Sequence, residues 1–146
     1  MSLFDMTTLA AAGVSANSAT GRAAQTRANI LEMTQAAEEA VLRPTEPGGV
    51  SHAMRATLAA RIAEAAGDST LAARYAGEKA DLPDHISAFA DKVANQTRDI
   101  AAEDIAALQT AGVADADIVR LCELVAFVAY QLRVVAGLRL MQGAAA

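Results

Sequence analysis

The sequence has few of the residues on which metal, disulfide or nucleic-acid chemistry depends. Cys122 is the single cysteine among 146 residues, which excludes an internal disulfide framework and a cysteine-rich zinc site. The two histidines show no metal-ligand spacing, so we expect no metal and no cofactor. Lys and Arg number 12 against 17 Asp and Glu, whereas nucleic acids and anionic membranes bind basic faces. We therefore expect neither of these partners.

Long apolar runs and a basic N-terminus are also missing. The longest apolar run, residues 124–132, is nine residues long, whereas a transmembrane helix needs about 20. Asp5 precedes the first basic residue, Arg22, unlike the positively charged start of a secretory signal. The sequence therefore predicts no membrane span, no signal peptide and a cytoplasmic location.

Alanine dominates what is present, with 38 copies in the chain. Alanine has the highest helix propensity, whereas strands favour aromatic and β-branched residues, and only five residues here are aromatic. Three prolines and nine glycines leave few breaks. These features predict an all-α protein. Because alanine buries little area per side chain, we also expect an oligomer to supply further burial.

Apolar periodicity and helix-end signals predict about six helices in one domain, residues 22–146, after a loose N-terminal arm, residues 1–21. The predicted helices cover residues 23–42, 52–66, 69–80, a segment opening at 83–84, 102–111 and 116–142. Ser51, Asp68 and Asp115 are the expected N-caps. The last helix has apolar residues on two sides, so one side is expected to face the core and the other a second subunit. Glu38, with its acidic neighbours, is expected on a solvated face.

Two stretches carry a family pattern. Residues 103–141 contain a short helix ending in LQTAG, a capped DADI start and a long helix with AFVAYQLRV, while residues 55–75 read RATLAARIAEAAGDSTLAARY. In order and spacing these stretches resemble the AhpD-like superfamily of carboxymuconolactone decarboxylases and alkylhydroperoxidases, over roughly residues 50–142. The resemblance implies an AhpD-like helical bundle that assembles into dimers, trimers or hexamers through the C-terminal helix.

The peroxidase branch of that superfamily carries a Glu, a Cys-x-x-Cys pair and a His. One thiolate attacks the peroxide, the second thiol resolves the sulfenic acid, and the Glu and His move protons. Aligned without gaps, the Cys positions hold Asp68 and Leu71, the His position holds Tyr75 and the Glu position holds Ala56. The resemblance therefore implies the fold without the thiol peroxidase mechanism.

Three other side chains are candidates for chemistry, each with a structural alternative. Cys122 is either a small core residue or the thiol of a one-cysteine peroxidase. His52 and His85 both stand at predicted helix starts. Each is either an exposed N-terminal residue or a general base kept neutral by the helix dipole.

Asp68, Tyr75 and Arg133 are the candidate ligand-binding residues. Asp68 and Tyr75 are either a helix cap and a packing residue, or they line the pocket that holds the thiols in the family's peroxidases and bind a polar ligand there. Arg133 interrupts an apolar helix, where a charge needs a partner. It is either in a salt bridge between helices or subunits, or the anchor of a carboxylate-bearing ligand.

Three functions follow as hypotheses. The first is a diverged AhpD-like protein that serves as an oligomeric binding or partner subunit. The second is a cofactor-free enzyme of the decarboxylase and lactone type, with His52 or His85 as base and Arg133 as carboxylate anchor. The third is a weak one-cysteine peroxidase that uses Cys122.

Overall fold

The computed structural model of the chain describes residues 1–143, and within them it contains helices and no strand. The all-α prediction is confirmed. The elements are the 3₁₀ helices η1 (Leu3–Asp5) and η2 (Thr97–Asp99), and α1 (Thr7–Ala12), α2 (Ala19–Gln25), α3 (Ala28–Leu42), α4 (His52–Ala65), α5 (Ser69–Tyr75), α6 (Asp84–Asn95), α7 (Ala102–Thr110) and α8 (Asp115–Met141).

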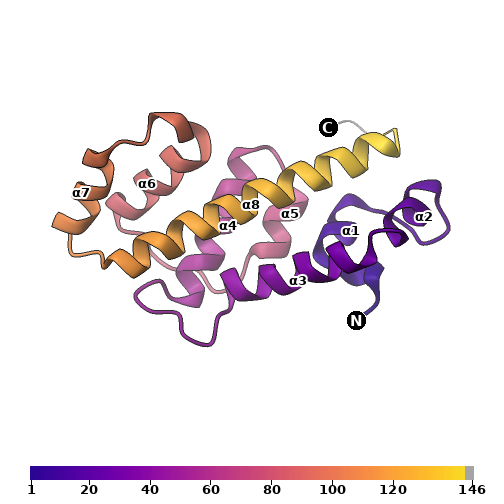
Figure 1. Cartoon of the computed structure of the whole chain (residues 1–146), viewed down its shortest axis with the longest axis horizontal. Coiled ribbons are helices and arrows are strands. Elements are labelled where there is room, and N and C mark those ends of the chain that lie inside the picture. The colour runs from indigo at the N-terminus through magenta and orange to yellow at the C-terminus, as the bar shows by residue number, and fades with distance from the viewer. Residues whose placement is uncertain (144–146) are drawn as a thin grey trace.

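Helix α8 is the central element of the fold. It runs along the length of the molecule and packs against α1, α3, α4, α6 and α7 (Figure 1). Its buried residues recur every three or four positions and include Leu121, Leu124, Val128 and Val135. One side of α8 therefore forms the core, as expected for the last helix. By length and composition alone α8 would also qualify as a membrane span, a criterion that a core helix meets as well.

Local capping rules place the α4–α5 pair. The Ser51 hydroxyl accepts a hydrogen bond from the Met54 amide, and the Asp68 carboxylate accepts one from Leu71, so both predicted N-caps are confirmed. Gly67 turns the chain between the helices with φ +82°, a conformation that favours glycine. Helix α5 is shorter than the predicted 69–80 and ends at Tyr75. The predicted cap Asp115 is instead the first residue of α8.

The N-terminal segment differs from the loose arm expected over residues 1–21. Residues 3–5, 7–12 and 19–25 are helical, and α1 packs on both α5 and α8. Leu9 is completely buried, and the hydroxyls of Thr7 and Thr8 bond to buried side chains. These helices are held by contacts with distant parts of the chain, which is why local periodicity did not reveal them.

The helix predicted over residues 23–42 is two helices, α2 and α3, which separate at residues 26–27. Neither proline nor glycine marks this break. Helix α2 instead sits close to the preceding loop: a Cβ on Gly21 would lie 2.0 Å from the backbone oxygen of Ser15. Only glycine permits this approach of the two backbones.

Candidate functional site

Asp68, which aligns with the first cysteine of the family pattern, is held in a structural ion pair. Its two carboxylate oxygens accept hydrogen bonds of 2.9 and 3.0 Å from the guanidinium of Arg139 on α8. Arg139 also donates to the backbone oxygen of Ala11 at 2.9 Å. The Asp68 side chain is 8% exposed and that of Arg139 21%. Asp68 thus caps α5 and ties it to α8 and, through Arg139, to α1.

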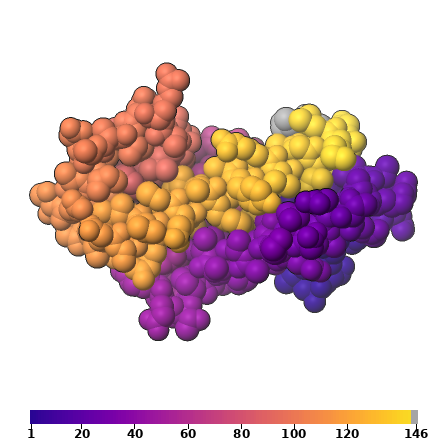
Figure 2. Space-filling view, viewed as in Figure 1, coloured from indigo at the N-terminus to yellow at the C-terminus, as the bar shows by residue number. Residues whose placement is uncertain are grey.

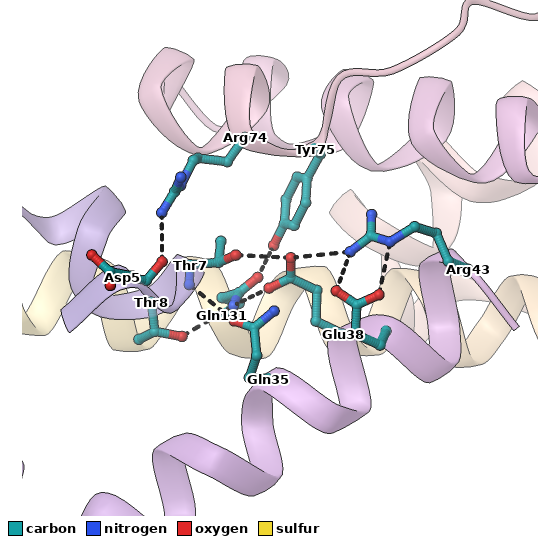
Figure 3. A network of polar contacts seen from close by, with 10 residues as sticks. Asp5, Thr7, Thr8, Gln35, Glu38, Arg43, Arg74, Tyr75 and Gln131 are labelled. Carbon is teal, nitrogen blue, oxygen red and sulfur yellow. Dashed lines mark hydrogen bonds and ion pairs between the residues drawn. The ribbon is translucent and has the colours of Figure 1, made fainter. Parts of the chain in front are cut away.

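The other three positions of the family pattern have separate surroundings. Leu71, at the second thiol position, is completely buried in the core. Tyr75, at the His position, is buried with its ring directed toward α3 and α8 (Figure 3). Ala56, at the Glu position, lines the same cavity as Tyr75. The structure therefore brings Ala56 and Tyr75 together, and Asp68 and Leu71 are not among the residues that line that cavity.

A buried polar cluster, called here the Glu38 network, lies beneath Tyr75 (Figure 3). The Tyr75 hydroxyl donates to Gln131 Oε1, and Gln131 Nε2 donates to Glu38 Oε2 and to the Thr8 hydroxyl, both at 3.0 Å. The Thr7 hydroxyl donates to Glu38 Oε1 at 2.8 Å. Glu38 is only 3% exposed, so its expected place on a solvated face is wrong. It faces α1 and α8 because their hydroxyl and amide groups satisfy both carboxylate oxygens.

Electrostatics keep Tyr75 protonated. Burial, and then the nearby Glu38 and Asp68 carboxylates, raise the pKa of Tyr75 far above its usual value. The phenol is therefore a hydrogen-bond donor and cannot serve as a base near neutral pH. Sequence analysis did not identify Gln131 as its acceptor, although a polar residue within the apolar run 124–132 was the available signal.

Above Tyr75 lies a cavity of about 230 Å³, called here the cationic pocket. It is formed where the end of α3, the start of α4 and the end of α5 meet, and its polar lining residues are Arg43, His52, Arg74, Tyr75 and Glu78. Figure 3 shows Arg43 and Arg74 on either side of Tyr75. Two guanidinium groups, set against the single lining carboxylate of Glu78, offer hydrogen-bond donors to an anionic ligand.

Each basic side chain of the pocket is already held by contacts within the protein. Arg43 donates to both carboxylate oxygens of Glu39, at 2.8 and 2.5 Å, and lies 3.9 Å from Glu38 Oε1. The bonds with Glu39 raise the pKa of Arg43 and lower that of Glu39. Arg74 donates to the Asp5 backbone oxygen at 3.1 Å. His52 Nε2 lies 2.8 Å from the Pro44 backbone oxygen. Because a carbonyl only accepts, Nε2 carries the hydrogen and Nδ1 of the neutral ring remains an acceptor.

Arg55 fixes the loop between α3 and α4, which lies next to the pocket and carries Pro44. This buried guanidinium donates to the backbone oxygen of Val41 in the last turn of α3 and to those of Pro47 and Val50 in the following loop, at 2.7–2.9 Å. Burial is the largest cause of a lowered pKa for Arg55, followed by repulsion from Arg120. The loop carrying Pro44, and with it the orientation of His52, is therefore anchored from inside the molecule.

The remaining predicted residues lie apart from the pocket. His85 is exposed in the first turn of α6, and Arg133 is exposed on α8 without an ion pair to any residue of 1–143. The expected ion pair of the last helix is made by Arg139 instead. Cys122 is partly buried, and burial followed by the charge of Glu123 raises the pKa of its thiol. Of the two predicted bases, only His52 reaches the pocket.

Two further cavities are present. One of about 430 Å³ follows α4 and α5 and shares Ala56, Ala76 and Gly77 with the cationic pocket, and one of about 340 Å³ between α2, α3 and α8 is largely apolar. Within residues 1–143, no three His, Cys, Asp or Glu side chains lie close enough together to hold a metal ion.

Comparisons with protein-family models, with curated proteins and with solved structures gave no match. The AhpD-like resemblance therefore rests on the residues quoted from the sequence, and it stays a prediction.

Proposed function

We propose that this chain is a diverged AhpD-like protein that lacks thiol peroxidase activity and binds a small carboxylate ligand as an oligomeric binding subunit. The cationic pocket is the observation that carries the proposal. Its volume of about 230 Å³ suits a small acid, and Arg43 and Arg74 offer planar donors that match a carboxylate. We further propose that the protein is cytoplasmic.

The contacts at the former thiol positions argue against peroxidase chemistry. A peroxidatic thiol needs a lowered pKa and a second thiol within one helical turn. Asp68 is engaged by Arg139, Leu71 is in the core, and the thiol of Cys122 on α8 has a raised pKa. A weak one-cysteine peroxidase is therefore the least supported of the three hypotheses.

The pocket, rather than the predicted trio of Asp68, Tyr75 and Arg133, supports binding. Asp68 and the Tyr75 hydroxyl are already engaged inside the protein, and Arg133 is exposed on α8. Arg43 and Arg74 have donors beyond the contacts described above, because each guanidinium has five N–H groups. In this proposal Arg43 and Arg74 bind the carboxylate, in place of Arg133.

Titration with succinate and benzoate, followed by amide chemical shifts, tests the binding. We expect saturable shifts around residues 43, 52 and 74–78, and an affinity at least tenfold weaker in Arg74→Gln. Arg98→Gln is the matched control, because Arg98 is an exposed arginine in η2 outside the pocket. Shifts that are absent, or that are equally weakened by both substitutions, would refute the proposed ligand site.

A cofactor-free decarboxylase or lactone-type enzyme is the second candidate. His52 supports it, because Nδ1 is an acceptor beside two arginines that could hold a substrate carboxylate. In this case His52→Gln would abolish turnover of a lactone carboxylate and retain its binding, whereas His85→Gln would change neither. A binding protein would show no turnover in any of these forms.

A further inference from the structure

Helix α8 carries an exposed stripe on the side that faces away from the core. The stripe consists of Val119, Glu123, Ala126, Tyr130, Arg133 and Gly137, all exposed. The spacing of four, three, four, three and four residues matches the helical period, so the stripe runs straight along α8 for about 27 Å. The space-filling view shows the central part of α8 uncovered (Figure 2).

The stripe combines exposed apolar side chains with charges that have no partner among the described residues. Val119 is 56% exposed and Tyr130 41%, and they are two of only six large apolar side chains exposed to this degree among the described residues. The Tyr130 hydroxyl also shares a hydrogen bond of 2.9 Å with Thr34 on α3, which fixes the position of this ring at the edge of the stripe. The two charges of the stripe, Glu123 and Arg133, form no ion pair within residues 1–143. Apolar groups and unused opposite charges on one face indicate a partner surface.

The order of the residues shows which partner fits. Residues at equal distances before and after position 128 form complementary pairs along the stripe. Five residues from the centre, Glu123 on one side corresponds to Arg133 on the other. Two residues from the centre, small Ala126 corresponds to large Tyr130, and nine residues away Val119 corresponds to Gly137.

We propose that α8 pairs with α8 of a second copy, antiparallel and around a two-fold axis at the level of residue 128. In this arrangement each Glu123 lies level with the Arg133 of the other copy, and each large apolar side chain lies level with a small residue. A two-fold dimer requires such a self-complementary surface. Parallel pairing would instead place like charges side by side. The inference rests on the oligomeric part of the proposed function and gives it a partner and a register.

Charge exchange tests the pairing on the full chain. Sedimentation equilibrium in low salt should give the wild type twice the chain mass of 15.0 kDa. Glu123→Arg and Arg133→Glu should each raise the dimer dissociation constant about 100-fold or more, since each creates two like-charge contacts. The combined variant Glu123→Arg/Arg133→Glu should return to the wild-type mass. Arg98→Glu, a charge reversal in η2, should leave the mass unchanged.

A cross-link tests the register independently. In a Cys122→Ser background, mixing Ala126→Cys protein with Tyr130→Cys protein should give a disulfide between the two different chains. A monomeric wild type would overturn both the dimer and the oligomeric part of the proposed function. An oligomer unaffected by either charge reversal, or an association that needs lipid, would overturn the α8 pairing alone. Succinate binding should stay unchanged in both charge-reversal variants, so the ligand pocket and the dimer are tested independently.

Discussion

Replacing Asp68 measures the structural contribution of the residue that aligns with the first cysteine of the AhpD-like pattern in the predicted resemblance. The side chain has two roles: it caps α5 through the Leu71 amide, and it forms a two-pronged ion pair with Arg139. Asp68→Ala removes both roles. Asp68→Asn keeps an acceptor for the cap and removes the charge, so the two variants separate the contributions.

The expected loss follows from these contacts. Removing an N-cap costs about 0.5–2 kcal/mol. Hydrogen bonds to charged groups contribute about 1.5–3 kcal/mol each when buried. Arg139 is 21% exposed and keeps its bond to the Ala11 oxygen, so water offsets part of its loss. We therefore expect Asp68→Ala to lower the free energy of unfolding by about 2–4 kcal/mol, and Asp68→Asn by about 1–2 kcal/mol.

Urea unfolding followed by far-ultraviolet circular dichroism gives these values, at one fixed protein concentration because dimerisation would add to stability. The double-mutant cycle of Asp68→Asn with Arg139→Gln should show a coupling energy of about 1–2 kcal/mol. A loss below about 0.5 kcal/mol for Asp68→Ala, or no coupling in the cycle, would refute the structural role.

Three more predictions concern other parts of the fold. Arg55→Met should lower the free energy of unfolding by about 3–5 kcal/mol in urea titrations, because three backbone oxygens lose their charged donor, and a loss below about 1 kcal/mol would contradict this. Gly21→Ala should cost at least about 1–3 kcal/mol by the same assay, since its Cβ would overlap the Ser15 oxygen, whereas an unchanged midpoint would show that the loop can move away. The raised pKa of Tyr75 means that the unfolded state releases its phenolic proton first, so this group stabilises the fold below about pH 10 and the contribution is lost above it. Tyr75→Phe should therefore show a shallower loss of stability with rising alkaline pH, and an identical slope in both proteins would count against the burial argument.

Features governed by short-range chemistry were predictable from the sequence. Alanine content and periodicity gave the helical class, and the caps at Ser51 and Asp68 follow from side chains that bond to amides three residues away. Gly67 marked the break between α4 and α5 because its positive φ is a local property. These rules do not depend on where the helices pack.

Features that depend on distant partners were not predictable. Glu38 looked like part of an acidic surface, but its partners Thr7 and Gln131 lie 31 and 93 residues away in sequence. Arg133 and Arg139 both interrupt the same apolar helix, and spacing alone could not show that only Arg139 meets a carboxylate, 71 residues away.

The cationic pocket was missed for the same reason. Arg43 directly follows α3 and Arg74 lies in α5, 31 residues further along the chain, and Arg43 lies outside the family pattern. His52 was a candidate because of its helix-start position and it lines the pocket, but the sequence hypothesis paired it with the distant Arg133. Tertiary packing decides which cations share a cavity, and no local signal encodes that choice.

The most direct test of the account is peroxide consumption by the purified protein with a dithiol as external reductant. We predict no turnover of hydrogen peroxide or an alkyl hydroperoxide above the protein-free rate, and no difference between wild type and Cys122→Ser. Turnover that depends on Cys122 would contradict the central claim that this helical scaffold works without thiol chemistry.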